Sequence, residues 1–262
     1  MQQRNHMDKT VTPESVSTVD DYRRLLQNKK SLEDPSSRSK GALAAIESFI
    51  LEEHLQPGDP LPTENELCER LGVSRSSVRE ALRQLQALDI VTVHQGRGTY
   101  VGEMSLRPFA QMMVLRSSLK STSLTSLKEV VQVRQTLDIG LAREIVMKVA
   151  GKQLTHLHQL VDTMVEKARN GQEFLVEDIE FHTGLVSELN NILLEELMNS
   201  LWLVHMSVLP VLPAAGKENM VATAKAHGAM LKAAEAGDTL GYMAAVQDHY
   251  SPLIESIEAL PA

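Results

Sequence analysis

The chain has 262 residues and a formal net charge of −8, and aromatic residues make up only 3% of it. This length suggests one large domain or two of ordinary size. Few aromatic residues beside many Met, Leu and Ala residues are typical of a helical protein, because strands prefer aromatic and β-branched side chains. The single cysteine, Cys68, excludes a disulfide framework and a cysteine-rich zinc module, and we expect it in the core.

No apolar run approaches the ~20 residues of a membrane-spanning helix, and the polar N-terminus lacks the apolar stretch of a signal peptide. We therefore expect a cytoplasmic protein with no membrane partner. The negative net charge argues against indiscriminate binding of nucleic acid. Any contact with nucleic acid must come from a local basic cluster.

The N-terminal third divides into a polar arm and a patterned segment. Residues 1–36 are polar, and we expect most of them to be disordered, with room for a short helix around Val19–Leu32. Apolar residues at helical spacing then predict a helix over residues 39–56, which the Pro-Gly pair after Gln56 ends.

Two further helices and a hairpin follow. A capping box formed by Thr63 and Glu66 opens a short helix over Glu64–Leu71. Ser74 caps a third helix that runs to about Leu88. Two short β-type runs, joined by a link with two glycines, then predict a hairpin over residues 90–101. Three helices followed by a hairpin predict a winged helix-turn-helix over residues 37–102.

The chain after Met104 has helical periodicity throughout. We expect residues 103–262 to form an all-α bundle of six or seven helices, joined to the first domain near Gly102–Leu106. The predicted fold is therefore mainly α, with a small β-hairpin wing. The helical segments are Leu124–Val149, Gln153–Ala168, Phe174–Leu189, Ile192–Leu209, Val221–Glu235 and Thr239–Ile257.

The third helix carries the residues expected to read DNA. In a helix-turn-helix, the second helix of the motif enters the major groove with its N-terminal residues at the base edges. Arg75 and Arg79 are four residues apart and therefore project from one face, and arginine is the usual bidentate partner of guanine. Ser76 and Ser77 suit phosphate contacts at a helix N-terminus.

Three motifs resemble those of the GntR family of bacterial transcription regulators. They are Leu-Pro-Thr-Glu-Asn-Glu-Leu at 61–67, Leu-Gly-Val-Ser-Arg-Ser-Ser-Val-Arg-Glu-Ala-Leu at 71–82 and Gly-Arg-Gly-Thr-Tyr-Val at 96–101. The resemblance implies a dimer on palindromic operator DNA. Asn65 and Gln95 differ from the pattern of the FadR branch, which puts the operator sequence in doubt. The DNA contacts it implies are Thr63, Asn65, Arg75, Ser76, Ser77, Arg79, Gln95, Gly96 and Arg97.

A second cluster lies in the helical half. Asp178 and His182 are four residues apart on one helix, so both can ligate one ion. His227 and His249 follow on later helices. Three imidazoles and one carboxylate suit a divalent metal, with zinc as the first expectation and nickel, iron or manganese as alternatives.

Residues 124–257 resemble the all-helical FCD effector domain of the FadR branch. Many members bind metal through an Asp-x-x-x-His pair and two later histidines, which the resemblance places at Asp178, His182, His227 and His249. Arg134 matches an arginine of the ligand cavity, where it would pair with a carboxylate or phosphate. Trp202, Met206 and the Pro210–Pro213 stretch are further candidates for the cavity lining.

Three functions fit these observations. The first is a homodimeric, metabolite-responsive repressor whose effector is a sugar acid, a hydroxy acid or a sugar phosphate. The second is a metal-dependent hydrolase fused to a DNA-binding module, although Glu180 points to another helix face than the predicted ligands and no clear general base stands beside them. The third is a DNA-binding protein with a purely structural metal and no effector.

Overall fold

The computed structural model describes residues 38–118, 123–209 and 216–260. The chain forms two compact units that divide between Met104 and Ser105, within the segment where sequence places the domain boundary. The expected disorder of residues 1–36 and the short helix around Val19–Leu32 lie outside the described residues.

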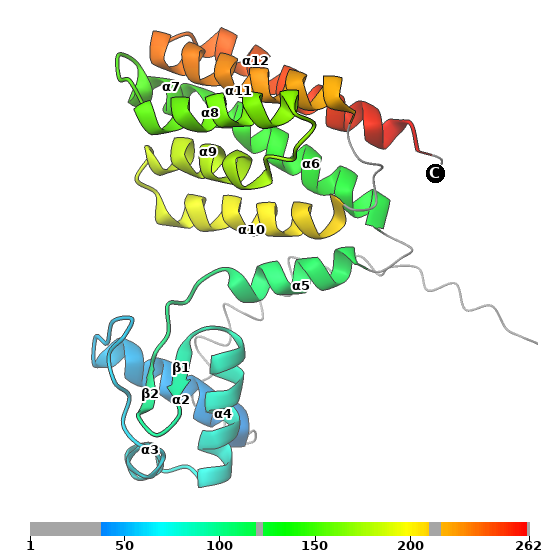
Figure 1. Ribbon diagram of the computed structural model, residues 1–262. Coiled ribbons are helices and arrows are strands. Elements are labelled where there is room, and N and C mark those ends of the chain that lie inside the picture. The colour runs from blue at the N-terminus through cyan, green and yellow to red at the C-terminus, as the bar shows by residue number, and fades with distance from the viewer. Residues whose placement is uncertain (1–37, 119–122, 210–215, 261–262) are drawn as a thin grey trace, which may run out of the picture. The chain divides into compact units, whose positions relative to one another are not determined.

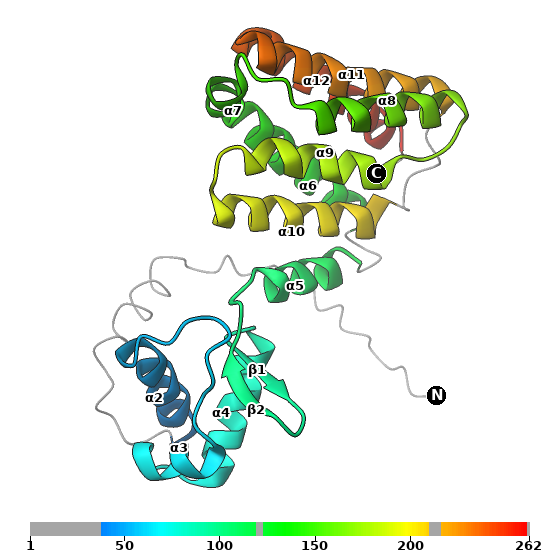
Figure 2. The same ribbon diagram turned by 60° about the vertical axis from the view of Figure 1, so that its left-hand side comes forward.

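The first unit is a three-helix domain with a two-stranded wing (Figures 1 and 2). The strands are antiparallel, and Val91 pairs with Val101 at one end and His94 with Gly98 at the other. The buried core joins all three helices to the base of the wing, and Cys68 is partly buried against it. The elements are α2 (Arg38–Glu52), α3 (Glu64–Leu71), α4 (Arg75–Ala87), β1 (Val91–His94) and β2 (Gly98–Val101).

Local chemistry explains where α3 and α4 begin and end. The backbone N–H of Thr63 donates to the Glu66 carboxylate at 2.8 Å, and Glu66 N–H donates back to the Thr63 hydroxyl, which closes the predicted capping box. Gly72 ends α3 in the left-handed conformation, with φ at 64°. Ser74 then accepts a hydrogen bond from Ser77 N–H and caps α4.

The second unit is an all-helical bundle. In both views α8, α9 and α10 run side by side, α11 packs against both α8 and α12, and α5 packs on α10 (Figures 1 and 2). One buried apolar cluster connects most of these helices. The helices are α5 (Arg107–Ser117), α6 (Ser123–Gly140), α7 (Ala142–Val149), α8 (Thr155–Arg169), α9 (Leu175–Ser187), α10 (Ile192–Val208), α11 (Lys217–Ala236) and α12 (Thr239–Glu258).

The fold class is confirmed, but the described residues of this bundle form eight helices rather than six or seven. Helix α5 escaped sequence analysis because it lacks a continuous apolar stripe, and Met112 and Leu115 on it are exposed. The single helix predicted over Leu124–Val149 is interrupted at Leu141, after Gly140, whose residue type disfavours helix. Hydrogen bonds to the preceding turn continue across this break, so the apolar periodicity continues as well.

No helix among the described residues is both long enough and apolar enough to span a lipid bilayer.

Candidate functional site

Helix α4 presents its arginines away from the core. Val78 and Leu82 are buried, whereas Arg75 and Arg79 are exposed one turn apart on the outer face. Glu64, at the start of α3, accepts a hydrogen bond from Nε of Arg79 at 2.7 Å. Sequence analysis did not single out Glu64, because nothing in the spacing of 15 residues indicates this pair.

The serines before and within the first turn of α4 form a small hydroxyl cluster. The Ser74 hydroxyl lies 2.9 Å from those of both Ser76 and Ser77. These groups surround the free N–H groups at the helix start, where a phosphate is favoured. Thr63 is already engaged in its capping box, while Asn65 is exposed beside it.

The wing tip is exposed and held in a tight turn. Gly96 has a φ of 74°, a conformation that side chains disfavour, and Gln95 and Arg97 flank it with exposed side chains. The Tyr100 hydroxyl donates to the Arg97 carbonyl at 3.2 Å and ties the tip to β2. The wing therefore offers a cation and a backbone turn at its end.

The structure brings together the four residues predicted to bind metal. Each of Asp178, His182, His227 and His249 offers a ligand atom, all within 4.8 Å of one another, and all four side chains are buried. Oδ1 of Asp178 lies 2.6 Å from Nε2 of His227 and 3.5 Å from Nε2 of His182. Helices α9, α11 and α12 each contribute ligands to one point.

A hydrogen bond fixes the orientation of one of these imidazoles, and a carboxylate lies behind a second. Nδ1 of His227 lies 2.9 Å from the Thr223 carbonyl, so it donates there and leaves Nε2 toward the cluster. Nδ1 of His182 lies 3.8 Å from Oδ2 of Asp138. A carboxylate or carbonyl behind a ligating histidine is the usual outer shell of a metal site.

The donor set fits a divalent metal. Nε2 of His182 and Nδ1 of His249 are buried without any hydrogen-bond partner, which is costly unless something else binds them. Burial and the neighbouring imidazoles lower the pKa of His249 well below its usual range, so it is neutral. Burial would raise the pKa of Asp178, but the adjacent imidazoles, His227 first and then His182, hold it well below its usual range. The neutral imidazole of His249 and the carboxylate of Asp178 are ligand forms that metals require.

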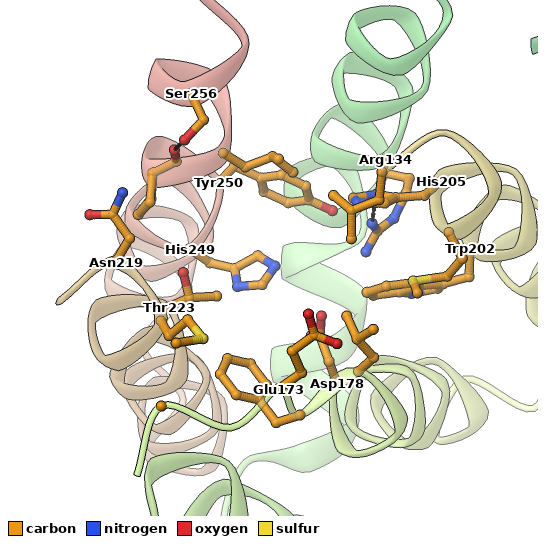
Figure 3. A pocket seen from close by; sticks show the side chains of 18 residues that line it. Arg134, Glu173, Asp178, Trp202, His205, Asn219, Thr223, His249, Tyr250 and Ser256 are labelled. Carbon is orange, nitrogen blue, oxygen red and sulfur yellow. Dashed lines mark hydrogen bonds between the residues drawn. The ribbon is translucent and has the colours of Figure 1, made fainter. Parts of the chain in front are cut away.

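A cavity of about 520 Å³ opens beside the cluster. Figure 3 shows Asp178 and His249 at its centre, with Arg134, Trp202 and His205 on one side. Asn219, Thr223 and Ser256 lie on the opposite side, so polar groups face each other across it. Trp202 and Met206 line the cavity as sequence analysis suggested, while Pro210–Pro213 lies outside the described residues.

Arg134 is held at the inner end of this cavity. Its side chain is 1% exposed, and its guanidinium carbon lies 3.6 Å from the centre of the Trp202 ring. One terminal nitrogen donates to Nδ1 of His205, but Nε and the other terminal nitrogen have no hydrogen-bond partner. A buried guanidinium with two unpaired nitrogens has the donors that an anion would accept from.

Sequence analysis missed His205 and Asp138. Burial, and then the charge of Arg134, lower the pKa of His205 to about 3, so it is a neutral acceptor for Arg134. Asp138 lies one helical turn after Arg134 on α6, a spacing that could have indicated a shared face. Asn191 caps α10, because its side-chain oxygen accepts a hydrogen bond from Leu194 N–H.

Comparison with known proteins matches each of the two units to a protein-family model. The family model described as "Bacterial regulatory proteins, gntR family" matches residues 38–101, and the model described as "FCD domain" matches residues 129–251. The chain belongs to the GntR family. It is a bacterial DNA-binding transcription regulator with an FCD effector domain, and not an enzyme.

Several proteins similar to this GntR chain have names that describe a regulator. The HTH-type transcriptional regulator LutR of Bacillus subtilis is 34% identical over 145 residues, which are 55% of this chain and 65% of that protein. The galactonate operon transcriptional repressor of Escherichia coli is 25% identical over 68% of this chain and 78% of its own length. The solved structure of a Streptococcus agalactiae GntR protein has a TM-score of 0.62 at 25% identity and covers 83% of this chain and 99% of its own.

Proposed function

We propose that this protein is a metabolite-responsive repressor. Its homodimer binds a palindromic operator, and its FCD domain binds a divalent metal and a small acid that changes operator affinity. The observation that carries the proposal is the shared cavity: Arg134, with two unpaired nitrogens, and two of the four potential metal ligands, Asp178 and His249, line the same 520 Å³ space.

DNA recognition is assigned to α4 and the wing. Arg75 and Arg79 read bases in the major groove, while Ser76 and Ser77 contact phosphates at the helix start. The wing tip, with Arg97, lies against the backbone or minor groove. Two such units in a symmetric dimer match the two half-sites of a palindrome. The remaining assigned contacts are Thr63, Asn65, Gln95 and Gly96.

The metal is held by Asp178, His182, His227 and His249. Zinc is our first choice, because a borderline metal suits imidazole and carboxylate ligands. When bound, the ion supplies a Lewis-acidic centre with room for an acidic ligand. The residues of this chain set its environment, since the Thr223 carbonyl orients one of the imidazoles and the Asp138 carboxylate lies behind a second.

Charge balance explains why an acid would enter. Arg134, Asp138 and Asp178 are buried in this region and carry one positive and two negative formal charges, whereas the carboxylate of Glu173 lines the cavity from an exposed position. A divalent cation therefore converts a surplus of one negative charge into a surplus of one positive charge. An effector with a carboxylate or phosphate group compensates that charge and satisfies Arg134.

The polar far wall suits hydroxyl groups on the effector. Asn219, Thr223 and Ser256 face the cavity opposite Arg134 (Figure 3). A hydroxy acid or sugar acid, or a sugar phosphate, could place its acidic end on Arg134 and its hydroxyls on this wall. The galactonate operon repressor among the relatives supports the sugar-acid class and the role of repressor.

The metal assignment is tested first, by native mass spectrometry with elemental analysis of the purified protein. We expect stoichiometric metal in the wild type and none after combined Asp178→Ala and His182→Ala substitution. A wild type that takes up no metal after incubation with zinc, nickel, iron and manganese would overturn the metal part of the proposal.

The effector assignment is tested by calorimetric titration of the metal-loaded dimer with galactonate, a short hydroxy acid and a sugar phosphate. We expect Arg134→Gln to weaken acid binding about 30-fold or more while metal content is unchanged. Arg143→Gln is the matched control, because Arg143 is exposed on α7. If no acid binds, the metal is structural. If Arg134→Gln and Arg143→Gln bind an acid equally well, Arg134 is not the receptor.

Effector and operator must affect each other equally. If the acid weakens operator binding by some factor, operator DNA weakens acid binding by the same factor. Fluorescence anisotropy with labelled operator, with and without the acid, measures one side of this coupling. Calorimetry with and without DNA measures the other, and affinities that do not change in either titration would exclude coupling between the two sites.

A further inference from the structure

The ion pair between Arg79 and Glu64 joins the recognition helix to the helix before it. Nε of Arg79 donates to Oε2 of Glu64 at 2.7 Å. The two helices are held at a fixed separation, since Leu67 on α3 and Val78 on α4 belong to one fully buried core. The geometry of the pair is therefore set by the packing of the domain.

Stability alone does not account for this pair. The Arg79 and Glu64 side chains are 60% and 40% exposed, and exposed ion pairs contribute little to folding. The other two acids of α3 have different places: Glu66 closes the capping box, and Glu69 is exposed. Glu64 alone among them reaches the recognition helix.

The hydrogen bond to Glu64 uses Nε of Arg79, and a bidentate contact with a base can be made by the two terminal nitrogens. An arginine that recognises guanine offers two N–H groups to O6 and N7. With Nε held by Glu64, the two terminal nitrogens of Arg79 are left to pair with O6 and N7 of a guanine. The carboxylate also offsets the charge of Arg79, which reduces its attraction to phosphates of any sequence.

We propose that Glu64 is a positioning residue that presets Arg79 for guanine and suppresses its non-specific binding to phosphate. This rests on the proposed role of Arg79 as a base reader. Arg75, on the same face of α4, has no such pair with Glu64, so the base that it reads should not depend on Glu64. The base preference at the position that Arg75 reads is therefore an internal control for the effect of Glu64 on Arg79.

The experiment is selection from a randomised double-stranded DNA library, with sequencing of the bound fraction, for the full-length protein. Arg79→Gln identifies the base pair that Arg79 reads. Glu64→Ala should lower the guanine preference at that position about fivefold or more and leave other positions of the half-site unchanged. Glu64→Gln, which keeps an uncharged acceptor, should give a smaller loss. Binding to random-sequence DNA should become tighter in both Glu64 variants, and unchanged binding would contradict the suppression of phosphate contacts.

Glu69→Ala is the matched control, since it removes the same charge from the same helix. It should keep the full half-site. Three further results would overturn the proposal. If Glu64→Ala retains the guanine preference that Arg79→Gln loses, Arg79 reads the base without help from Glu64. Equal losses in Glu64→Ala and Glu69→Ala would assign the effect to net charge. An unchanged site in Arg79→Gln would remove both this proposal and the base-reading role of Arg79.

Discussion

The hydroxyl of Tyr250 donates to Oδ2 of Asp138 at 2.7 Å, deep in the helical domain. The same carboxylate oxygen lies 3.8 Å from Nδ1 of His182, while Tyr250 itself lines the cavity. Asp138 therefore contacts both a residue of the cavity wall, Tyr250, and a proposed metal ligand, His182. A ligand that displaces Tyr250 would remove the hydrogen bond from Tyr250 to Asp138, the carboxylate that lies beside His182. This contact would connect the proposed effector to the proposed metal.

The first prediction concerns Asp138. Asp138→Asn keeps the shape of the side chain but removes the charge behind His182, so we expect metal affinity to fall about 10- to 100-fold. Tyr250→Phe removes only one hydrogen bond to Asp138 and should cost less. Competition with a chromophoric chelator measures both affinities. Equal affinity in wild type and Asp138→Asn would show that Asp138 does not support the ligand.

The second prediction concerns pH. The pKa of His205 is lowered to about 3 in the folded chain, below the usual value of 6.5, so only the unfolded chain takes up this proton between those values. The free energy of unfolding therefore has its full value above pH 6.5, as far as His205 is concerned, and it falls as the pH is lowered from 6.5 towards 3. His205→Gln should remove up to about 1.4 kcal/mol per pH unit of this loss, because glutamine does not titrate.

Urea denaturation of the metal-free protein between pH 7 and pH 5 checks this, with the helical domain followed by Trp202 fluorescence. His249 and Asp178 titrate in both proteins, so the difference between the two pH profiles isolates His205. Parallel profiles for the wild type and His205→Gln would contradict a neutral, buried imidazole at this position.

The third prediction compares two glycines. A Cβ at Gly102 would lie 2.2 Å from the carbonyl oxygen of Asp89, so Gly102→Ala forces the backbone apart and should cost about 1–3 kcal/mol. A Cβ at Gly140 meets nothing within 4 Å, and Gly140→Ala at the end of α6 should stabilise by about 0.5–1 kcal/mol. Hydrogen exchange of the two domains, resolved by mass spectrometry, reports each change in its own unit. Changes of the same sign in both variants would contradict this reasoning.

The fourth prediction concerns the start of the recognition helix. Ser74→Ala removes the side-chain acceptor for Ser77 N–H, and we expect α4 to lose about 1 kcal/mol of local stability. Hydrogen exchange over residues 75–87 should then be about fivefold faster. Ser251→Ala, an exposed substitution on α12, serves as control and should leave those amides unchanged.

Sequence alone determined the features that depend on neighbours along the chain. The capping box of Thr63, the start of α4 after Ser74 and the hairpin follow from local hydrogen bonds and backbone preferences. The pairing of Asp178 with His182 follows from the helical repeat, because residues four apart share a face. The resemblance to known motifs then added His227 and His249, which no local rule connects to them.

Tertiary structure decided what depends on packing between distant segments. Arg134 is buried against Trp202, with two nitrogens unpaired, because α6 and α10 meet there. Asp138 reaches His182 and Tyr250, and Glu64 reaches Arg79, only after helices far apart in sequence have packed. Such contacts arise from the burial of apolar faces elsewhere on those helices, and the periodicity of one segment carries no information about which partner it will meet.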